Sequence, residues 1–136
     1  MARPYIGGSN GAIKAVSADT TLQLADHGKT LVVDGSSSGN ITITLPATTS
    51  SKGYETTIIL GAANNAATEV LITSDTNIVG FIIDSDNGNA AYATSGASRG
   101  FADASKAGSK IKLVCDGAKW LILDAASDLA MVTAFS

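Results

Sequence analysis

The stretch that most constrains the fold is residues 110–124, KIKLVCDGAKWLILD, in which two apolar runs flank an Asp-Gly pair. Asp-Gly accepts the positive φ angles of a tight turn, so the stretch predicts a β-hairpin. A two-residue loop pairs Leu113 with Trp120, while a four-residue loop shifts the partners by two and keeps the same faces. In either register one side is apolar and predicts a core face around the only tryptophan, made of Ile111, Leu113, Cys115, Trp120 and Ile122.

The opposite side of this hairpin mixes charged and apolar side chains. It is too apolar for a freely solvated surface and too charged for a core, so we expect another chain to cover part of it. Its apolar members, Val114, Leu121 and Leu123, are our candidates for the interface with that chain. The charged residues on the same side are Lys110, Lys112 and Lys119.

Length and composition favour one domain with little charge on its surface. A chain of 136 residues has room for one real core. Charged residues make up 15%, below the roughly 25% usual in soluble domains, and the net charge of −3 argues against nucleic-acid binding through phosphates. No apolar run approaches the roughly 18 residues of a membrane span, and the N-terminus lacks the apolar region of a secretory signal, so we expect synthesis in a cytoplasm.

Short candidate strands separated by turns indicate an all-β fold, an antiparallel β-sandwich or jelly-roll-like β-barrel with an extended N-terminal arm. The clearest alternation is ITITLP (41–46), which Pro46 ends. Together with TLVVD (30–34) it predicts a second hairpin over 30–46. No segment of normal helix length combines a 3.6-residue period with capping signals. The other expected strands are 13–17, 20–24, 54–62, 69–73, 78–84, 91–93 and 99–102.

We expect the chain to divide into three parts. Residues 1–18 form an N-terminal arm and first short strand, 19–124 the sandwich or barrel, and 125–136 a C-terminal tail or strand.

The arm is punctuated by glycine yet carries Arg3, Tyr5 and Ile6. Two interpretations stay open, a disordered terminus and an arm that orders on a partner. Near the other end, Met131 and Phe135 are the matching apolar groups. We take all of these residues as candidates for contacts with a neighbouring copy or a larger assembly.

The sequence contains no convincing pattern for catalysis or metal binding. The only histidine, His27, lies beside Asp26 in a turn, where both residue types are expected anyway. Cys115 is the only cysteine, so it forms no intrachain disulfide, and its apolar strand predicts a small core residue rather than a nucleophile. Asp84 and Asp86 offer oxygens, but their loop lacks the Gly and Glu of an EF-hand. We therefore expect no enzyme, no metal and no cofactor.

Several segments in order resemble a β-module of tailed-bacteriophage structural proteins. In that module an ITLP strand precedes a glycine-led strand, an I.G segment and a closing hairpin with a DG turn followed by Trp. The module occurs in small trimeric capsid decoration (cement) proteins and in tail fibres and tailspikes. This chain departs from it at Cys115, where Ser is usual, and at Leu121, where a polar or aromatic residue is common. The matching segments are GKTLVVDG (28–35), ITITLPA (41–47), GYETTIIL (53–60), ITSDTNIVGFI (72–82) and GSKIKLVCDGAKWLIL (108–123).

The resemblance implies a homotrimeric structural virion protein that binds the capsid exterior and stabilises the shell. In such a trimer, Val114, Leu121 and Leu123 would be the candidates for the trimer interface. Its partners would be copies of itself and the major capsid protein, without nucleic acid or membrane. The chain ends soon after the module, which favours a decoration protein over a longer fibre. The alternative is a receptor- or glycan-binding head of a tail fibre or tailspike, for which Tyr92, Arg99 and Phe101 are the candidate residues. A small hydrolase comes last, because no acid, base or nucleophile stands out.

Overall fold

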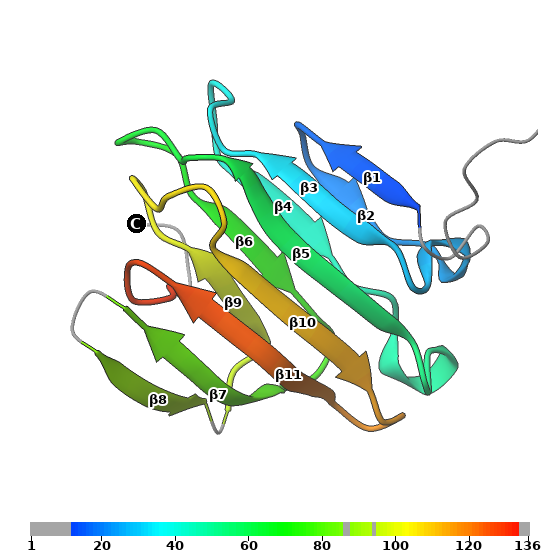
Figure 1. The fold of residues 1–136 in the computed structure, drawn as a ribbon. Helices are drawn as coiled ribbons and strands as arrows, with labels where there is room; N and C mark the ends of the chain where they lie inside the picture. The colour runs from blue at the N-terminus through cyan, green and yellow to red at the C-terminus, as the bar shows by residue number, and fades with distance from the viewer. Residues whose placement is uncertain (1–11, 86–87, 94, 134–136) are drawn as a thin grey trace, which may run out of the picture.

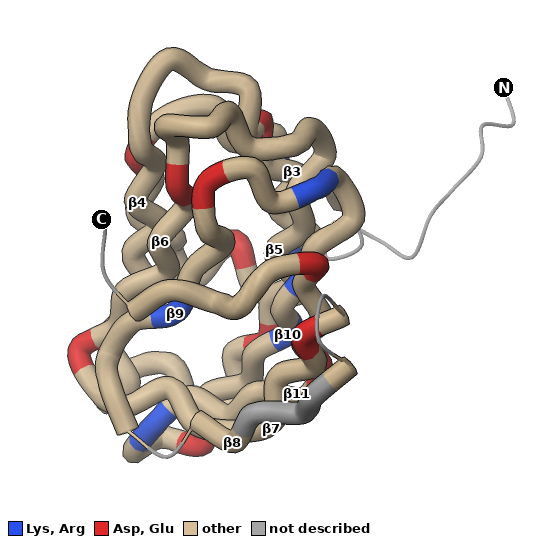
Figure 2. Tube along the Cα trace, turned by 90° about the vertical axis from the view of Figure 1, so that its left-hand side faces the viewer, with Lys and Arg blue, Asp and Glu red and all other residues tan. Residues whose placement is uncertain are grey.

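The computed structural model describes residues 12–85, 88–93 and 95–133, which form two β-sheets packed face to face (Figure 2). Sheet A has seven strands in the order β1-β3-β5-β10-β11-β7-β8, and sheet B has four in the order β2-β4-β6-β9. The expected all-β sandwich is therefore confirmed. The strands are β1 Ile13–Val16, β2 Thr20–Thr21, β3 Thr30–Asp34, β4 Ile41–Thr44, β5 Glu55–Ala62, β6 Val70–Thr73, β7 Ile78–Asp84, β8 Asn89–Ala93, β9 Ser98–Phe101, β10 Lys110–Cys115 and β11 Trp120–Ser127.

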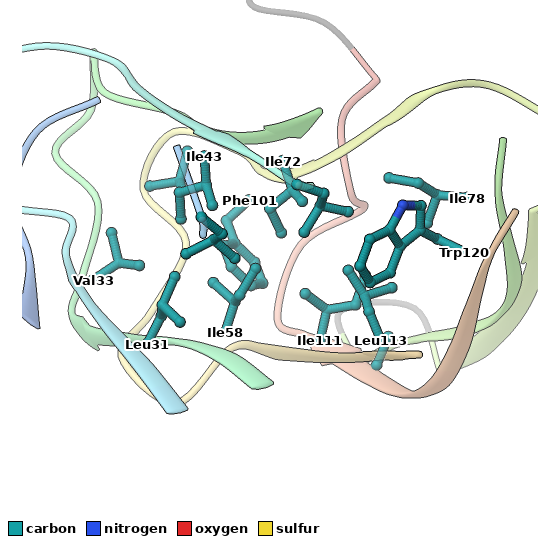
Figure 3. Close-up of a cluster of buried hydrophobic side chains, with 14 of the residues drawn as sticks. Leu31, Val33, Ile43, Ile58, Ile72, Ile78, Phe101, Ile111, Leu113 and Trp120 are labelled. Carbon is teal, nitrogen blue, oxygen red and sulfur yellow. The ribbon is translucent and has the colours of Figure 1, made fainter. Parts of the chain in front are cut away.

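The core lies between the sheets and follows the period-two alternation of the strands. Leu31 and Val33 of β3 point inward from sheet A, and Ile43 of β4 meets them from sheet B (Figure 3). Trp120 is fully buried and packs edge-on to a neighbouring tyrosine ring. The predicted core face of the last hairpin is confirmed, with Ile111, Leu113, Cys115 and Trp120 buried and Ile122 packed against them.

Strand pairing differs from the expected antiparallel pattern, because both sheets are mixed. In sheet A, β3 lies parallel to β1 and β5, and in sheet B, β4 lies parallel to β2 and β6. Antiparallel pairs are confined to the partners of β8, β9 and β10. The chain thus changes layer at every connection from β1 to β7, and again before and after β9 (Figure 1).

The predicted hairpin over 30–46 is consequently wrong. β3 and β4 lie in opposite sheets and are joined by an arch, so their inward faces oppose each other across the core. Contacts between successive arches hold this geometry: the Asn65 side chain donates to the carbonyl oxygens of Ser36 and Ser37, and Asn40 Oδ1 accepts from the Glu69 amide. Period-two alternation cannot distinguish an arch from a hairpin, because both bury alternate residues.

The 110–124 hairpin is confirmed with the longer of its two loops, since Cys115 pairs with Trp120. A β-bulge follows, so that Lys112 pairs with Asp124 rather than with Leu123. The hairpin, although last in the chain, occupies the middle of sheet A between β5 and β7.

Both ends of the described chain contribute to the sheets. β1 pairs with β3 in sheet A, and β11 continues three residues beyond the expected 124 to Ser127. Farther on, Val132 forms a two-way backbone bridge with Gly100 of β9. Within the described residues, no helix has the length and apolar character that a membrane crossing would require. The helical segments described are two single 3-10 turns, Leu24–Asp26 and Thr48–Ser50.

Candidate interaction surface

The His27 turn has a structural explanation. His27 Nδ1 accepts a hydrogen bond from the Glu55 amide at 3.0 Å, and the ring lies 5.6 Å from that of Tyr54. The Tyr54 hydroxyl donates to the carbonyl oxygen of Gln23 at 3.1 Å. Burial, aided by the nearby charge of Asp26, raises the pKa of Tyr54 to about 12. The ring and the imidazole therefore join the 3-10 turn to the start of β5, in agreement with the turn predicted from sequence.

Asp26 is a buried carboxylate that holds two lysines. Its oxygens lie 3.0 Å from Lys14 Nζ and 3.0 Å from Lys29 Nζ, and it accepts the Gln23 amide at 2.9 Å. Burial alone would raise its pKa, but the amide and the two ammonium groups outweigh burial and lower the pKa to about 2. This cluster ties β1 to the turn before β3, so its charges serve the fold.

Cys115 is buried in the core, as predicted, with its Sγ 3.6 Å from the carbonyl oxygen of Thr48. Across the described residues, no group of three or more His, Cys, Asp or Glu side chains is placed to hold a metal ion. Asp84 is buried at the end of β7, whereas Asp86 lies outside the described residues.

Two of the three residues expected to form the groove of a receptor- or glycan-binding head are buried. Arg99 is only 4% exposed and Phe101 is fully buried, both on the inward face of β9. The guanidinium of Arg99 donates to the carbonyl oxygens of Ser95 and Ser98, within 2.6 Å. Tyr92 alone of the three is exposed, and it lies in sheet A rather than beside β9.

The outward face of sheet A, which faces the viewer in Figure 1, is the most distinctive surface of the described chain. Every large hydrophobic side chain that the described part of the chain exposes lies on it, except Leu24. Between its exposed groups lie half-buried apolar side chains that continue the surface from strand to strand, namely Val32, Ile59, Val79, Val114 and Leu121. The exposed ones are Ile13 (70%), Phe81 (66%), Tyr92 (57%), Leu123 (55%) and Ile83 (53%).

The charges on this face neutralise one another. Lys110 Nζ lies 2.8 Å from Asp124, and Lys112 Nζ lies 2.9 Å from Glu55. Both pairs are well exposed, so each contributes little to stability, but together they neutralise the charge at the centre of the face. A surface that is apolar and electrically balanced suits a partner of the same character.

The structure brings the three predicted interface residues to this one face. Val114 pairs directly with Leu121, which in turn pairs with Val79 of β7. The bulge turns Leu123 and Asp124 both outward, where simple alternation would have turned Asp124 inward.

The predicted assembly contacts at the chain ends fall largely outside the described residues. Arg3, Tyr5, Ile6 and Phe135 all do so. Met131 is described, and its side chain is half-buried against the core.

Sequence reasoning missed Phe81 and Ile83, which extend this apolar face. The available signal was IVGFIID (78–84), whose alternate residues are apolar on both sides of the strand. Such a run predicts a strand covered on both faces. Here the described chain covers only one of them.

Comparison of the chain with protein-family models, with curated proteins and with solved structures finds no match in any of the three.

Proposed function

We propose that this chain is a structural virion protein, a homotrimeric decoration (cement) protein that binds the outer surface of a bacteriophage capsid and stabilises the shell. The observation that carries the proposal is the apolar, charge-balanced outer face of sheet A. Apolar faces of this extent usually mark interaction sites. The ordered segments between residues 28 and 123 that resemble the phage module supply the viral context.

Physically, the protein would act as a fastener. Contact between copies removes Val114, Leu121 and Leu123 from water, and a closed ring also protects sheet edges. A trimer that binds several shell subunits at once favours the assembled shell, because ligands that bind one state stabilise that state. The chain would be made in the host cytoplasm and would end on the capsid exterior, with the major capsid protein as its second partner.

Three measurements test this proposal. Light scattering should give a particle of three times 13.6 kDa, about 41 kDa. Mixing with expanded empty shells of the virus that encodes the chain should give saturable binding with a stoichiometry set by the shell lattice. Deleting residues 1–10 should keep the trimer and weaken shell attachment, if the arm makes the contact. A monomer at micromolar concentration that does not bind shells would contradict the proposal.

The alternative, a receptor- or glycan-binding head, now depends on Tyr92, because Arg99 and Phe101 are buried. Glycan-array binding that Tyr92→Ala abolishes would favour this alternative. Without such binding, self-association remains the better use of the exposed ring.

A further inference from the structure

The outer face of sheet A is uneven, and its two ends have opposite shapes. At the β7–β8 end, the rings of Phe81 and Tyr92 face each other across the strand pair with centroids 4.6 Å apart. Both rings are more than half exposed, and Ile83 and Leu123 are exposed on the same face. We call this group, Phe81 and Tyr92, the aromatic knob.

At the β1–β3–β5 end the same face is hollowed. Mostly small side chains line a depression of about 560 Å³, and Val32 is among them. Gly61 is essential to its shape, because a Cβ there would lie 2.4 Å from Val32 Cγ1. We call this depression the hollow; it is lined by Ala15, Val32, Asp34, Ser36, Gly61 and Ala62, among others.

A chain cannot fill its own hollow with its own knob. Four strand spacings separate β3 from β7 in sheet A, which is about 19 Å. Both features also lie on the same side of one sheet, in which β1, β3 and β5 lie on one side of the β10–β11 hairpin and β7 and β8 on the other (Figure 1). The occupant must therefore come from another molecule.

The chemistry of the hollow suits a tyrosine-bearing apolar partner. Its wall is largely aliphatic, and its polar rim holds Asp34, whose Oδ1 accepts from the amide and the hydroxyl of Ser36. Those hydrogen bonds lower the pKa of Asp34, so it is an ionised acceptor at neutral pH. A tyrosine that buries its ring can donate its hydroxyl to such a rim.

A second copy of this chain meets these requirements. It offers the aromatic knob, and its face carries the same balanced pairs, Lys110–Asp124 and Lys112–Glu55, so two faces meet without net repulsion. Seven strands at about 4.8 Å spacing and about 20 Å length give each copy a face of roughly 600 Å². Shared between two neighbours, this face would bury a total per copy that is comparable with the roughly 800 Å² per partner of a stable interface.

We propose that the aromatic knob of one copy packs into the hollow of the next copy. This inference rests on the self-association in the proposed function and identifies its contact. Because knob and hollow are different patches, each copy gives a knob to one neighbour and a hollow to another. Contacts of this heterologous kind close into rings when the rotation allows it.

Sedimentation of three variants tests the contact. Phe81→Ala/Tyr92→Ala removes the knob, Ala15→Phe fills the hollow from an exposed position, and Leu24→Ala is the control, since Leu24 is 55% exposed but lies away from this face. The first two should each weaken association about 100-fold or more, because buried aromatic anchors dominate interfaces. Leu24→Ala should behave as wild type. Mixing the first two variants should restore one intact contact and give a 1:1 pair that does not grow.

A cross-linking measurement traps the contact covalently, so it detects the contact even where a substitution in the knob has weakened association. Mixed under mild oxidation, Ala15→Cys and Tyr92→Cys copies should form an interchain disulfide, whereas Ala15→Cys and Leu24→Cys copies should not. Cys115 is buried and should not compete.

The outcomes separate this inference from the proposed function. If wild type assembles and the knob and hollow variants assemble equally well, the knob-into-hollow contact is overturned while self-association stands. If wild type never assembles, self-association fails and the contact fails with it. Near-ultraviolet circular dichroism of each variant confirms folding, and Tyr92→Phe, which keeps the ring, provides a milder variant that should weaken association less than Tyr92→Ala.

Discussion

The two outward faces of the sandwich come from the same alternating pattern, yet they differ in chemistry. The outward face of sheet A presents Phe81, Ile83, Tyr92 and Leu123. The outward face of sheet B instead presents a row of hydroxyl groups, one from each strand. That row consists of Thr21, Thr44, Thr73 and Ser98, which pair in register across the sheet.

The difference shows which face gains from being covered. A threonine hydroxyl bonds to water as readily as to a partner, so covering the sheet B face yields little free energy. Exposed aliphatic and aromatic groups gain about 25 cal/mol for each Å² removed from water. Covering the outward face of sheet A would therefore yield more free energy than covering the outward face of sheet B.

The largest expected effect on stability comes from a substitution on the inner, core-facing side of sheet A. Trp120→Ala should lower the free energy of unfolding by about 3–5 kcal/mol, since it leaves a cavity in the core. Trp120→Phe should cost less, because the indole Nε1 has no hydrogen-bond partner to lose. Urea unfolding at one protein concentration measures both. A loss below about 1 kcal/mol for the alanine variant would contradict the assigned core face.

The next effect compares the two outer faces directly. Leu121→Asp places a carboxylate between Val114 and Val79 and should weaken self-association about 100-fold, or about 2.7 kcal/mol. Thr44→Asp, the matched change on sheet B, should leave association within about threefold of wild type. Sedimentation equilibrium measures both constants. Equal losses would mean that both faces, or neither, take part in assembly.

Low pH should lower the stability of the sandwich through Asp26, which lies on neither outer face. The pKa of Asp26 is about 2 in the folded protein and 3.8 for the unperturbed group, so its contribution is complete above about pH 4 and is lost as the pH falls toward 2. Asp26→Asn should lower stability by about 1–2 kcal/mol at pH 7 and by almost nothing at pH 2. Unfolding measured across this range provides the check. A loss that does not depend on pH would exclude the ion pairs with Lys14 and Lys29 as its cause.

The smallest effect concerns the hydroxyl row. Thr44→Val with Thr73→Val should change stability by no more than about 0.5 kcal/mol, because both side chains are half-exposed and their mutual contact is a weak 3.5 Å one. The oligomeric state should stay unchanged. If the double variant instead associates through sheet B, the hydroxyl groups of Thr44 and Thr73 are what prevents association through that face in the wild type.

The sequence alone predicted the positions of most strands and the buried face of the last hairpin. These predictions depend on apolar residues at alternate positions, such as Ile41 and Ile43, because the alternation within one strand shows which of its faces is buried. It also placed Val114, Leu121 and Leu123 on a partly apolar outer side. It missed Phe81 and Ile83 as parts of the same face, because that requires β7 to lie beside β11.

By itself, the sequence determined what each strand buries, since alternation, turn residues and a single tryptophan act over a few residues. Only the tertiary structure decided which strands are neighbours. The arch after β3, the parallel pairs and the insertion of the last hairpin between β5 and β7 depend on backbone hydrogen bonds between distant segments. The local pattern of side chains does not reveal those hydrogen bonds. The knob and the hollow exist only once the bonds have brought the strands together.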